Sequence, residues 1–135
     1  MTEDAEFEET TDGILIAVRP QYLENQSDPD AGRYVWAYHV RIENHGAQSV
    51  QLITRHWRIT DATGGVHEVR GDGVVGEQPV LAPGERYEYS SGTPLSTPTG
   101  FMGGSFQMVS AAGDRFDARI PSFSLDSPHH RVQLH

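Results

Sequence analysis

The chain has 135 residues, the size of one ordinary domain, and it contains no cysteine. The absence of cysteine excludes disulfides, thiol nucleophiles, iron–sulfur clusters and thiolate zinc sites. Ten basic residues, all of them arginine, stand against 19 acidic ones, which gives a formal net charge of -9. This charge disfavours binding to a nucleic-acid backbone, and the lack of lysine excludes a Schiff-base mechanism and a P-loop.

The N-terminal stretch is acidic and has no apolar run, so it does not have the pattern of a signal peptide. Residues 1–11 are expected to form a solvated, flexible acidic tail. No segment reaches the ~20 apolar residues that a membrane helix needs. The sequence therefore predicts a cytoplasmic protein that does not insert into a membrane.

Apolar and polar residues alternate along several segments in the way that is typical of β-strands. A short apolar run at 14–18 predicts a first strand. Over 34–44, aromatic and β-branched residues alternate with polar ones, which indicates a half-buried antiparallel strand. Residues 50–60 predict a second long strand. Its alternation slips near Leu52 and Ile53, which indicates either a β-bulge or burial on both faces.

The rest of the chain continues as short strands that are separated by turn residues. Strands are expected at 66–70 and 86–90 and around 106–110 and 116–120, and no segment shows a helical period. Seven or eight short strands in one domain predict an all-β fold, an antiparallel β-sandwich. We place this domain at 12–126, followed by a flexible C-terminal tail at 127–135.

Gly71, Gly73 and Gly76 form a G-x-G-x-x-G motif, which is the spacing of dinucleotide-binding loops. Such a site needs a helix directly after the glycines, whereas the β-branched residues and proline within 74–79 disfavour one. We therefore expect no dinucleotide-binding fold. The loop and the adjacent Arg70 remain a candidate site for a small anion in a backbone nest. The alternative is that the glycines only permit a tight turn.

Side chains near this loop suggest two further kinds of chemistry. Arg55 and Arg58 lie on the neighbouring predicted strand and carry groups that suit phosphate oxygens. His56 could meet Asp61 or His67 across a hairpin as a metal site, although strand pairing alone carries no ligand-spacing signature. The sequence shows no nucleophile elbow and no base beside an orienting partner. We therefore expect neither an enzyme nor a cofactor.

The segment 92–104 is interpreted as an unusually long loop that contains Leu95, Phe101 and Met102 among prolines and glycines. Two interpretations stay open at this point. The apolar side chains form a surface for a protein partner, or they close the open end of the sandwich core.

The segment 55–108 resembles the ApaG family in many short pieces that follow one another in a fixed order. Together with the strand at 34–46, the resemblance covers about residues 12–126. The matching pieces are Arg55-His-Trp57, Ile59-Thr-Asp-Ala62, Glu68-Val69, Gly71-x-Gly-Val-Val-Gly76, Gln78-Pro79, Pro83-Gly-Glu85, Ser91-Gly92, Pro94-Leu95, Thr97-Pro98 and Met102-x-Gly104.

The resemblance implies a β-sandwich of the fibronectin type III or immunoglobulin kind. Bacterial members of the family are linked to cobalt resistance and magnesium efflux and often carry the name CorD. In eukaryotic F-box proteins and in a polymerase-delta-interacting protein, the same domain looks like a protein-interaction module. The family's glycine motif, described there as a pyrophosphate contact, corresponds to Gly71, Gly73 and Gly76. The resemblance brings no catalytic set.

These points lead to two functional hypotheses. The first is a non-enzymatic domain that acts through a protein partner, with divalent-cation homeostasis implied by the resemblance. The second is a sensor or enzyme that binds pyrophosphate or another small anion in the loop from Gly71 to Gly76. An edge-to-edge homodimer is compatible with either hypothesis, because a sandwich with an open edge offers unpaired backbone groups.

Overall fold

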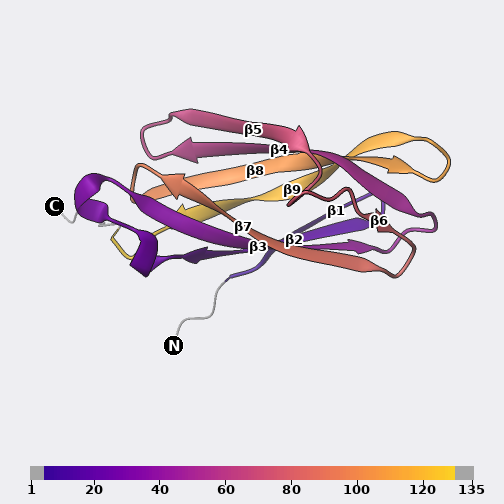
Figure 1. Ribbon diagram of the computed structural model, residues 1–135, viewed down its shortest axis with the longest axis horizontal. Helices are drawn as coiled ribbons and strands as arrows, with labels where there is room; N and C mark the ends of the chain where they lie inside the picture. The colour runs from indigo at the N-terminus through magenta and orange to yellow at the C-terminus, as the bar shows by residue number, and fades with distance from the viewer. Residues whose placement is uncertain (1–4, 130–135) are drawn as a thin grey trace.

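The computed structural model describes residues 5–129, which form two antiparallel β-sheets packed face to face (Figure 1). Only two single-turn 3-10 helices interrupt the strands in this part of the chain. The elements in chain order are β1 (Phe7–Thr11), β2 (Ile14–Tyr22), η1 (Glu24–Gln26), η2 (Pro29–Ala31), β3 (Tyr34–Asn44), β4 (Val50–Asp61), β5 (Val66–Asp72), β6 (Val80–Leu81), β7 (Arg86–Leu95), β8 (Thr99–Ser110) and β9 (Arg115–Asp126).

The first sheet has the strand order β1-β2-β3-β7, and the second has the order β5-β4-β8-β9 with β6 paired to β4. The all-β sandwich and its fibronectin type III-like architecture are therefore confirmed. The described residues contain nine strands rather than seven or eight. The strands β1 and β6 were not predicted, because the first lies in an acidic segment and the second has only two residues.

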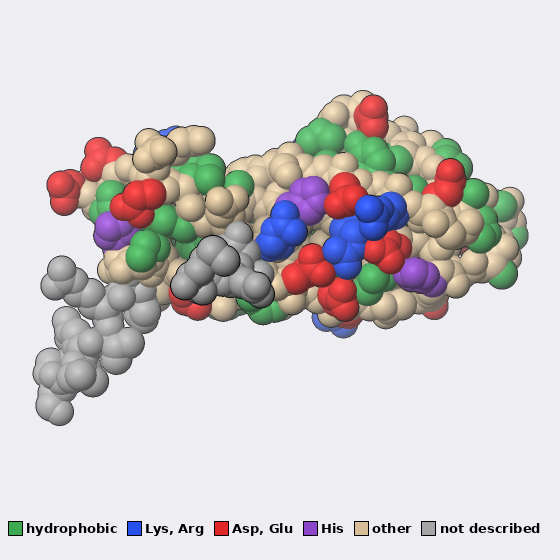
Figure 2. All heavy atoms as spheres, turned by 90° about the horizontal axis from the view of Figure 1, so that it is seen from below, with side chains coloured by type: hydrophobic (Ala, Val, Ile, Leu, Met, Phe, Trp, Pro, Cys, Tyr) green, Lys and Arg blue, Asp and Glu red, His purple; other side chains and the backbone are tan. Residues whose placement is uncertain are grey.

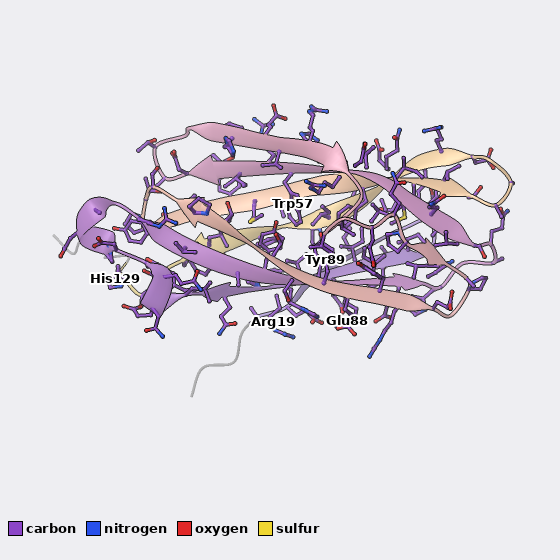
Figure 3. All side chains as sticks on the ribbon, in the orientation of Figure 1. Arg19, Trp57, Glu88, Tyr89 and His129 are labelled. Atoms are coloured by element: carbon purple, nitrogen blue, oxygen red, sulfur yellow. The ribbon has the colours of Figure 1, made fainter. Side chains whose placement is uncertain are left out.

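The core lies between the two sheets and is built from alternate residues of the strands. Its centre is Trp57 on β4, whose side chain is almost completely buried. The Trp57 ring lies 4.9 Å from that of Tyr38 and 6.3 Å from that of Phe106, measured between centroids. Figure 3 shows Trp57 and Tyr89 in the interior, whereas Arg19 and Glu88 project from the outer face of the first sheet.

The expected acidic tail at 1–11 is wrong for its second half, because Phe7–Thr11 is strand β1 and pairs with β2. Phe7 stacks on Phe123 of β9 at a centroid distance of 5.7 Å, which anchors the strand to the core. Arg41 of β3 forms ion pairs with Glu6 and Glu8, so part of the local negative charge is neutralised. Residues 1–4 lie outside the described part of the chain.

The expected C-terminal tail at 127–135 begins with residues that are held in place. Ser127 is buried, and its backbone N–H donates a hydrogen bond to the Pro98 carbonyl. The His129 ring lies 3.1 Å from a carboxylate oxygen of Glu24, measured from its Nε2 atom. The rest of this predicted tail, 130–135, lies outside the described residues.

The slip in alternation on β4 is a β-bulge, since the pairing of β4 with β8 shifts by one residue between Leu52 and Thr54. The bulged residue is Ile53, and its carbonyl accepts a hydrogen bond from the Gly73 N–H and another from the Gln78 side chain. The bulge therefore fixes the point at which the glycine loop attaches to β4.

A buried asparagine connects β3 to the second sheet. Asn44 is 1% exposed, and its side-chain amide donates to the carbonyls of Gln48 and Leu81. Its side-chain oxygen accepts a hydrogen bond from the Gly46 N–H. Because each polar atom of this side chain has a partner, its burial does not leave an unpaired group.

Charged side chains of both signs cover the outer face of the first sheet, and Figure 2 shows them gathered there. Arg41 pairs with Glu43, His45 lies 2.8 Å from the same carboxylate, and His39 lies 2.8 Å from Glu88. Partial burial opposes ionisation of Glu43, but hydrogen bonds from His45 and Arg41 outweigh it. The pKa of Glu43 is therefore lowered from its usual 4.5.

A carboxylate whose pKa is lower in the folded state stabilises the fold at neutral pH, and this contribution disappears as the pH falls through the folded pKa. We therefore expect Glu43→Gln to lower the free energy of unfolding at pH 7 by less than about 1 kcal/mol. The difference from wild type should shrink below pH 4.5 and vanish once the pH lies below the folded pKa of Glu43. Urea unfolding across this pH range measures it, with Asp117→Asn as the matched control. A difference independent of pH would contradict the assignment.

Candidate functional site

The second half of the glycine motif is a tight two-residue turn at the end of β5. The backbone N–H groups of Val74 and Glu77 donate to each other's carbonyls at 2.8 and 2.9 Å. Between them, Val75 and Gly76 both have positive φ values, 43° and 82°. This pattern is that of a type I′ hairpin turn, in which glycine is favoured. In the described residues β6 follows this loop, and no helix does.

Most of the amides in the loop have partners inside the chain. The Gly73 N–H donates to the bulged Ile53, and the N–H groups of Val74 and Glu77 close the turn. Among the described residues, no partner is recorded for the amides of Val75 and Gly76 at the exposed tip. A backbone nest for an anion would therefore be limited to these two successive amides.

Arg55 is the arginine that the fold brings to the loop. Its Nη1 atom donates to the backbone carbonyls of Asp72 and Gly73, each at 3.0 Å. The side chain passes across Gly71, where an added Cβ would stand 2.8 Å from the guanidinium carbon. The first glycine of the motif thus makes room for an arginine that binds carbonyl oxygens.

Arg70, the predicted anion contact, has a largely exposed side chain. Its guanidinium lies 3.7 Å from the Glu68 carboxylate. Arg58 on β4 is exposed as well. The structure therefore gathers Gly71, Gly73 and Arg55, whereas Arg70 pairs with an acidic neighbour. Anion binding by this loop stays a prediction.

The sequence suggested Asp61 or His67 as the partner of His56, but the hairpin of β4 and β5 brings His56 to a different residue. The register places His56 opposite Arg70, and its Nε2 atom lies 2.8 Å from the Glu68 carboxylate. The Asp61 carboxylate instead accepts hydrogen bonds within the turn at 61–65, from Thr63 and from the Gly65 N–H. Residues 5–129 contain no group of three or more side chains that could hold a metal ion.

The segment 92–104 is a hairpin rather than a long loop, because β7 continues to Leu95 and β8 begins at Thr99. Leu95 and Met102 are buried in the core, whereas Phe101 is 53% exposed on the outer face. The two open interpretations therefore divide by residue. Leu95 and Met102 belong to the core, and Phe101 alone is available at the surface.

One flank of the sandwich is closed and the other is open. On the closed flank β1 lies against β9, where the Arg119 N–H donates to the Thr11 hydroxyl and Arg119 pairs with Glu9. On the open flank the edge strands are β5 and β7. A hollow of about 630 Å³, the flank groove, lies at one end of this flank. Its lining includes Arg33, Ile59, Val66, His67, Pro94 and Leu95.

A smaller hollow of about 150 Å³ shares Ile59 with the flank groove and reaches Tyr38, Arg55 and Trp57. Burial raises the pKa of Tyr38, although a hydrogen bond from Ser91 and the charge of Arg55 act in the opposite direction. Burial also raises the pKa of Tyr89, whose hydroxyl has no hydrogen-bond partner among the described residues. Both phenols are therefore protonated at neutral pH and do not act as bases.

A family model described as the ApaG domain matches residues 24–110, which is more than half of the chain. The chain belongs to the ApaG family. It is 65% identical over 125 residues to Protein ApaG of Rhodospirillum centenum, covering 93% of this chain and 96% of that one. The identity to Protein ApaG of Parvibaculum lavamentivorans is 61% over 125 residues, with the same two shares covered.

A crystal structure of a Bordetella pertussis protein described under the name ApaA has the same architecture. It superposes with a TM-score of 0.84 at 50% sequence identity, covering 87% of this chain and 95% of that chain. The resemblance of the strand pattern and the glycine motif to ApaG is thus confirmed. None of the helices in residues 5–129 has the length and apolar character needed to cross a bilayer.

Proposed function

We propose that this ApaG-family protein acts by binding a protein partner and not by catalysis, and that the flank groove receives a segment of that partner. The observation that carries the proposal is the groove on the open flank, where Val66 is exposed and the nearly buried Ile59 and Leu95 form part of the lining. Edge strands beside it carry backbone groups that an extended segment can pair with. Concave apolar surface next to a free edge is typical of peptide recognition.

The chemistry of the open flank also supports a role in binding. Its phenols, Tyr38 and Tyr89, stay protonated in their buried positions, and the arginine beside them, Arg55, is bound to backbone carbonyls. Neither arrangement supplies a nucleophile beside a base. The family's link to cobalt resistance and magnesium efflux makes a cytoplasmic component of divalent-cation homeostasis the proposed partner.

The groove can be blocked from its rim without disturbing the core. Ser96 lines the groove and is exposed, so Ser96→Trp places a large side chain at its mouth. Ser124→Trp, at an exposed position of β9, is the matched control. We expect cross-linking in cells to capture a partner with wild type and the control, and Ser96→Trp to lower its yield by about tenfold. When either tryptophan variant is expressed in a deletion strain, the amount of folded protein should be the same. Growth of the strain in cobalt should stay impaired only with Ser96→Trp.

Capture that is equally strong with Ser96→Trp would contradict the role of the groove. Turnover of a phosphate ester or pyrophosphate by the pure protein that persists in every groove variant would contradict the non-enzymatic role. The second candidate function, a small-anion sensor or enzyme, is favoured by one observation. The successive amides of Val75 and Gly76 lie at an exposed tip without a recorded partner among the described residues.

A further inference from the structure

The outer edge of β5 is unprotected. β5 pairs with β4 over Val66–Asp72 without a register shift, and within the described residues no strand covers its other side. Natural edge strands are usually blunted by proline, lysine, a bulge or a covering segment. The strands β1 and β9 cover each other, and β7 contains Pro94. β5 has none of these four, and the charged side chains that it does carry, Glu68, Arg70 and Asp72, are of both signs.

The direction of the backbone groups along β5 follows from two hydrogen bonds at its ends. The Gly65 carbonyl accepts from the Asp61 N–H, and the Gly73 N–H donates to Ile53, so both residues face β4. Because backbone groups alternate in direction along a strand, the odd-numbered residues between them also face β4. Glu68 and Arg70 therefore direct their N–H and C=O groups away from the sheet.

We propose that a second copy of this chain pairs with this edge, antiparallel, with the two-fold axis at Val69. In this register Glu68 of each copy lies opposite Arg70 of the other, and these residues exchange backbone hydrogen bonds. Val69 meets its own copy as a non-hydrogen-bonded pair. The proposal does not depend on the proposed function of the flank groove, but a copy paired to β5 leaves β7 as the edge strand that is open to a partner segment there.

Charge complementarity selects both the partner and the register. Each chain has a net charge of -9, so association through most of the surface is opposed by repulsion. At this edge, opposite charges directly across from each other stabilise the pairing. Shifting the register by two residues, the repeat of a β-strand, places Glu68 opposite Glu68 in one direction and Arg70 opposite Arg70 in the other. The pairing at Val69 also uses the whole length of β5, with Val66 opposite Asp72.

The other face of the strand fits the same register. His67 lies opposite Gly71 of the second copy, and this glycine has no side chain to oppose it. Arg55 already donates to the Asp72 carbonyl at one end of the edge. The central hydrogen bonds between Glu68 and Arg70 are therefore the ones on which the pairing depends most. Glu68 and Arg70 both have side chains that are about half exposed or more, so both can turn to a partner.

Charge reversal tests the pairing and its register together. By sedimentation, wild type should approach twice its 14.9 kDa mass as its concentration rises. Glu68→Arg or Arg70→Glu alone should raise the dimer dissociation constant about tenfold or more, because each dimer contains the pair twice. The double variant, with the two charges exchanged, should return to within about threefold of wild type. A monomeric wild type up to about 1 mM, or a double variant no better than the single ones, overturns the proposal.

Cysteine cross-linking is the second test and does not rely on charge. The chain has no cysteine, so a single introduced thiol reports only on contact between copies. Opposed residues of a non-hydrogen-bonded pair have Cα atoms about 4.5 Å apart, within the range of a disulfide. Val69→Cys should therefore form a covalent dimer on mild oxidation. Val66→Cys should not, because the two copies of residue 66 would be about 20 Å apart. Equal cross-linking of both variants, or none with Val69→Cys, overturns the proposed register.

The groove variant separates this proposal from the proposed function. Ser96 lies in the turn after β7 and not on β5, so Ser96→Trp should keep the sedimentation mass of wild type. Loss of the dimer in that variant would mean that the copies associate through the flank groove, which also overturns the edge pairing.

Discussion

Replacing Trp57 with alanine is expected to lower the free energy of unfolding by about 3–5 kcal/mol, the range for deleting a large buried aromatic side chain. Trp57 is 2% exposed and packs between rings from both sheets, Tyr38 on one side and Phe106 and Phe123 on the other. The neighbouring rings belong to regular strands and cannot collapse far into the space. Urea unfolding followed by circular dichroism measures the loss.

Phe101→Ala is the matched control, because Phe101 is an aromatic residue on the adjacent strand β8 and is 53% exposed. Its removal should change the free energy of unfolding by about 0.5 kcal/mol or less. A Trp57→Ala protein within about 1 kcal/mol of wild type would mean that the sandwich does not depend on this ring.

The second large effect is expected at the centre of the glycine motif, from Gly73→Ala. Gly73 has a φ of +64°, and an added Cβ would stand 2.2 Å from the Glu77 carbonyl oxygen. The turn must open or the hydrogen bond to the bulge must break, and we expect a loss of about 2 kcal/mol or more. Gly76→Ala is the control. Its φ is +82°, but nothing lies within 4 Å of the added Cβ, so only about 1 kcal/mol is expected.

A calorimetric titration of pyrophosphate into the same proteins separates the structural role of the loop from a ligand site. If the glycines are structural, Gly73→Ala is less stable than wild type by the amount above. If the loop is a site, wild type gives saturable heat, and Gly73→Ala, although destabilised, gives none at a temperature at which it remains folded. The titration is best made with and without magnesium, at low and at moderate salt, because surface charge interactions weaken with ionic strength.

The elements predicted correctly from sequence are those whose signal is local. The aromatic and β-branched alternation in β3 depends on one buried face, and the irregularity at Ile53 was visible as a slip in that alternation. The strand β1, which was expected to be part of a flexible tail, has an acidic sequence. It becomes a strand because Arg41 and Phe123, which are distant in sequence, lie beside it. Local propensity does not contain that information.

The candidate site shows the same division. The glycine spacing predicted a loop, and the absence of a helix after it was evident from the residues that follow. The contact of Arg55 with the Asp72 and Gly73 carbonyls depends on the register of β4 against β5, which places Arg55 opposite Gly71. The sequence does contain a signal for this contact, because Arg55 and Gly71 lie at equal distances from the hairpin turn between β4 and β5. It is readable only once the hairpin register is known.

The bulge at Ile53 makes β4 two half-strands of opposite phase. Before it, Val50 and Leu52 face the core; after it, Trp57 and Ile59 do, although they differ from the first pair by an odd number of positions. If Ile53 were kept but paired regularly with β8, so that the bulge disappeared, the alternation of Val50 and Leu52 would continue and exchange the two faces of the second half. His56 and Arg58 would then point into the sandwich and Trp57 into water. One residue without a partner in β8 thus decides which side of this strand is interior, and with it the orientation of every side chain that β4 presents to the open flank.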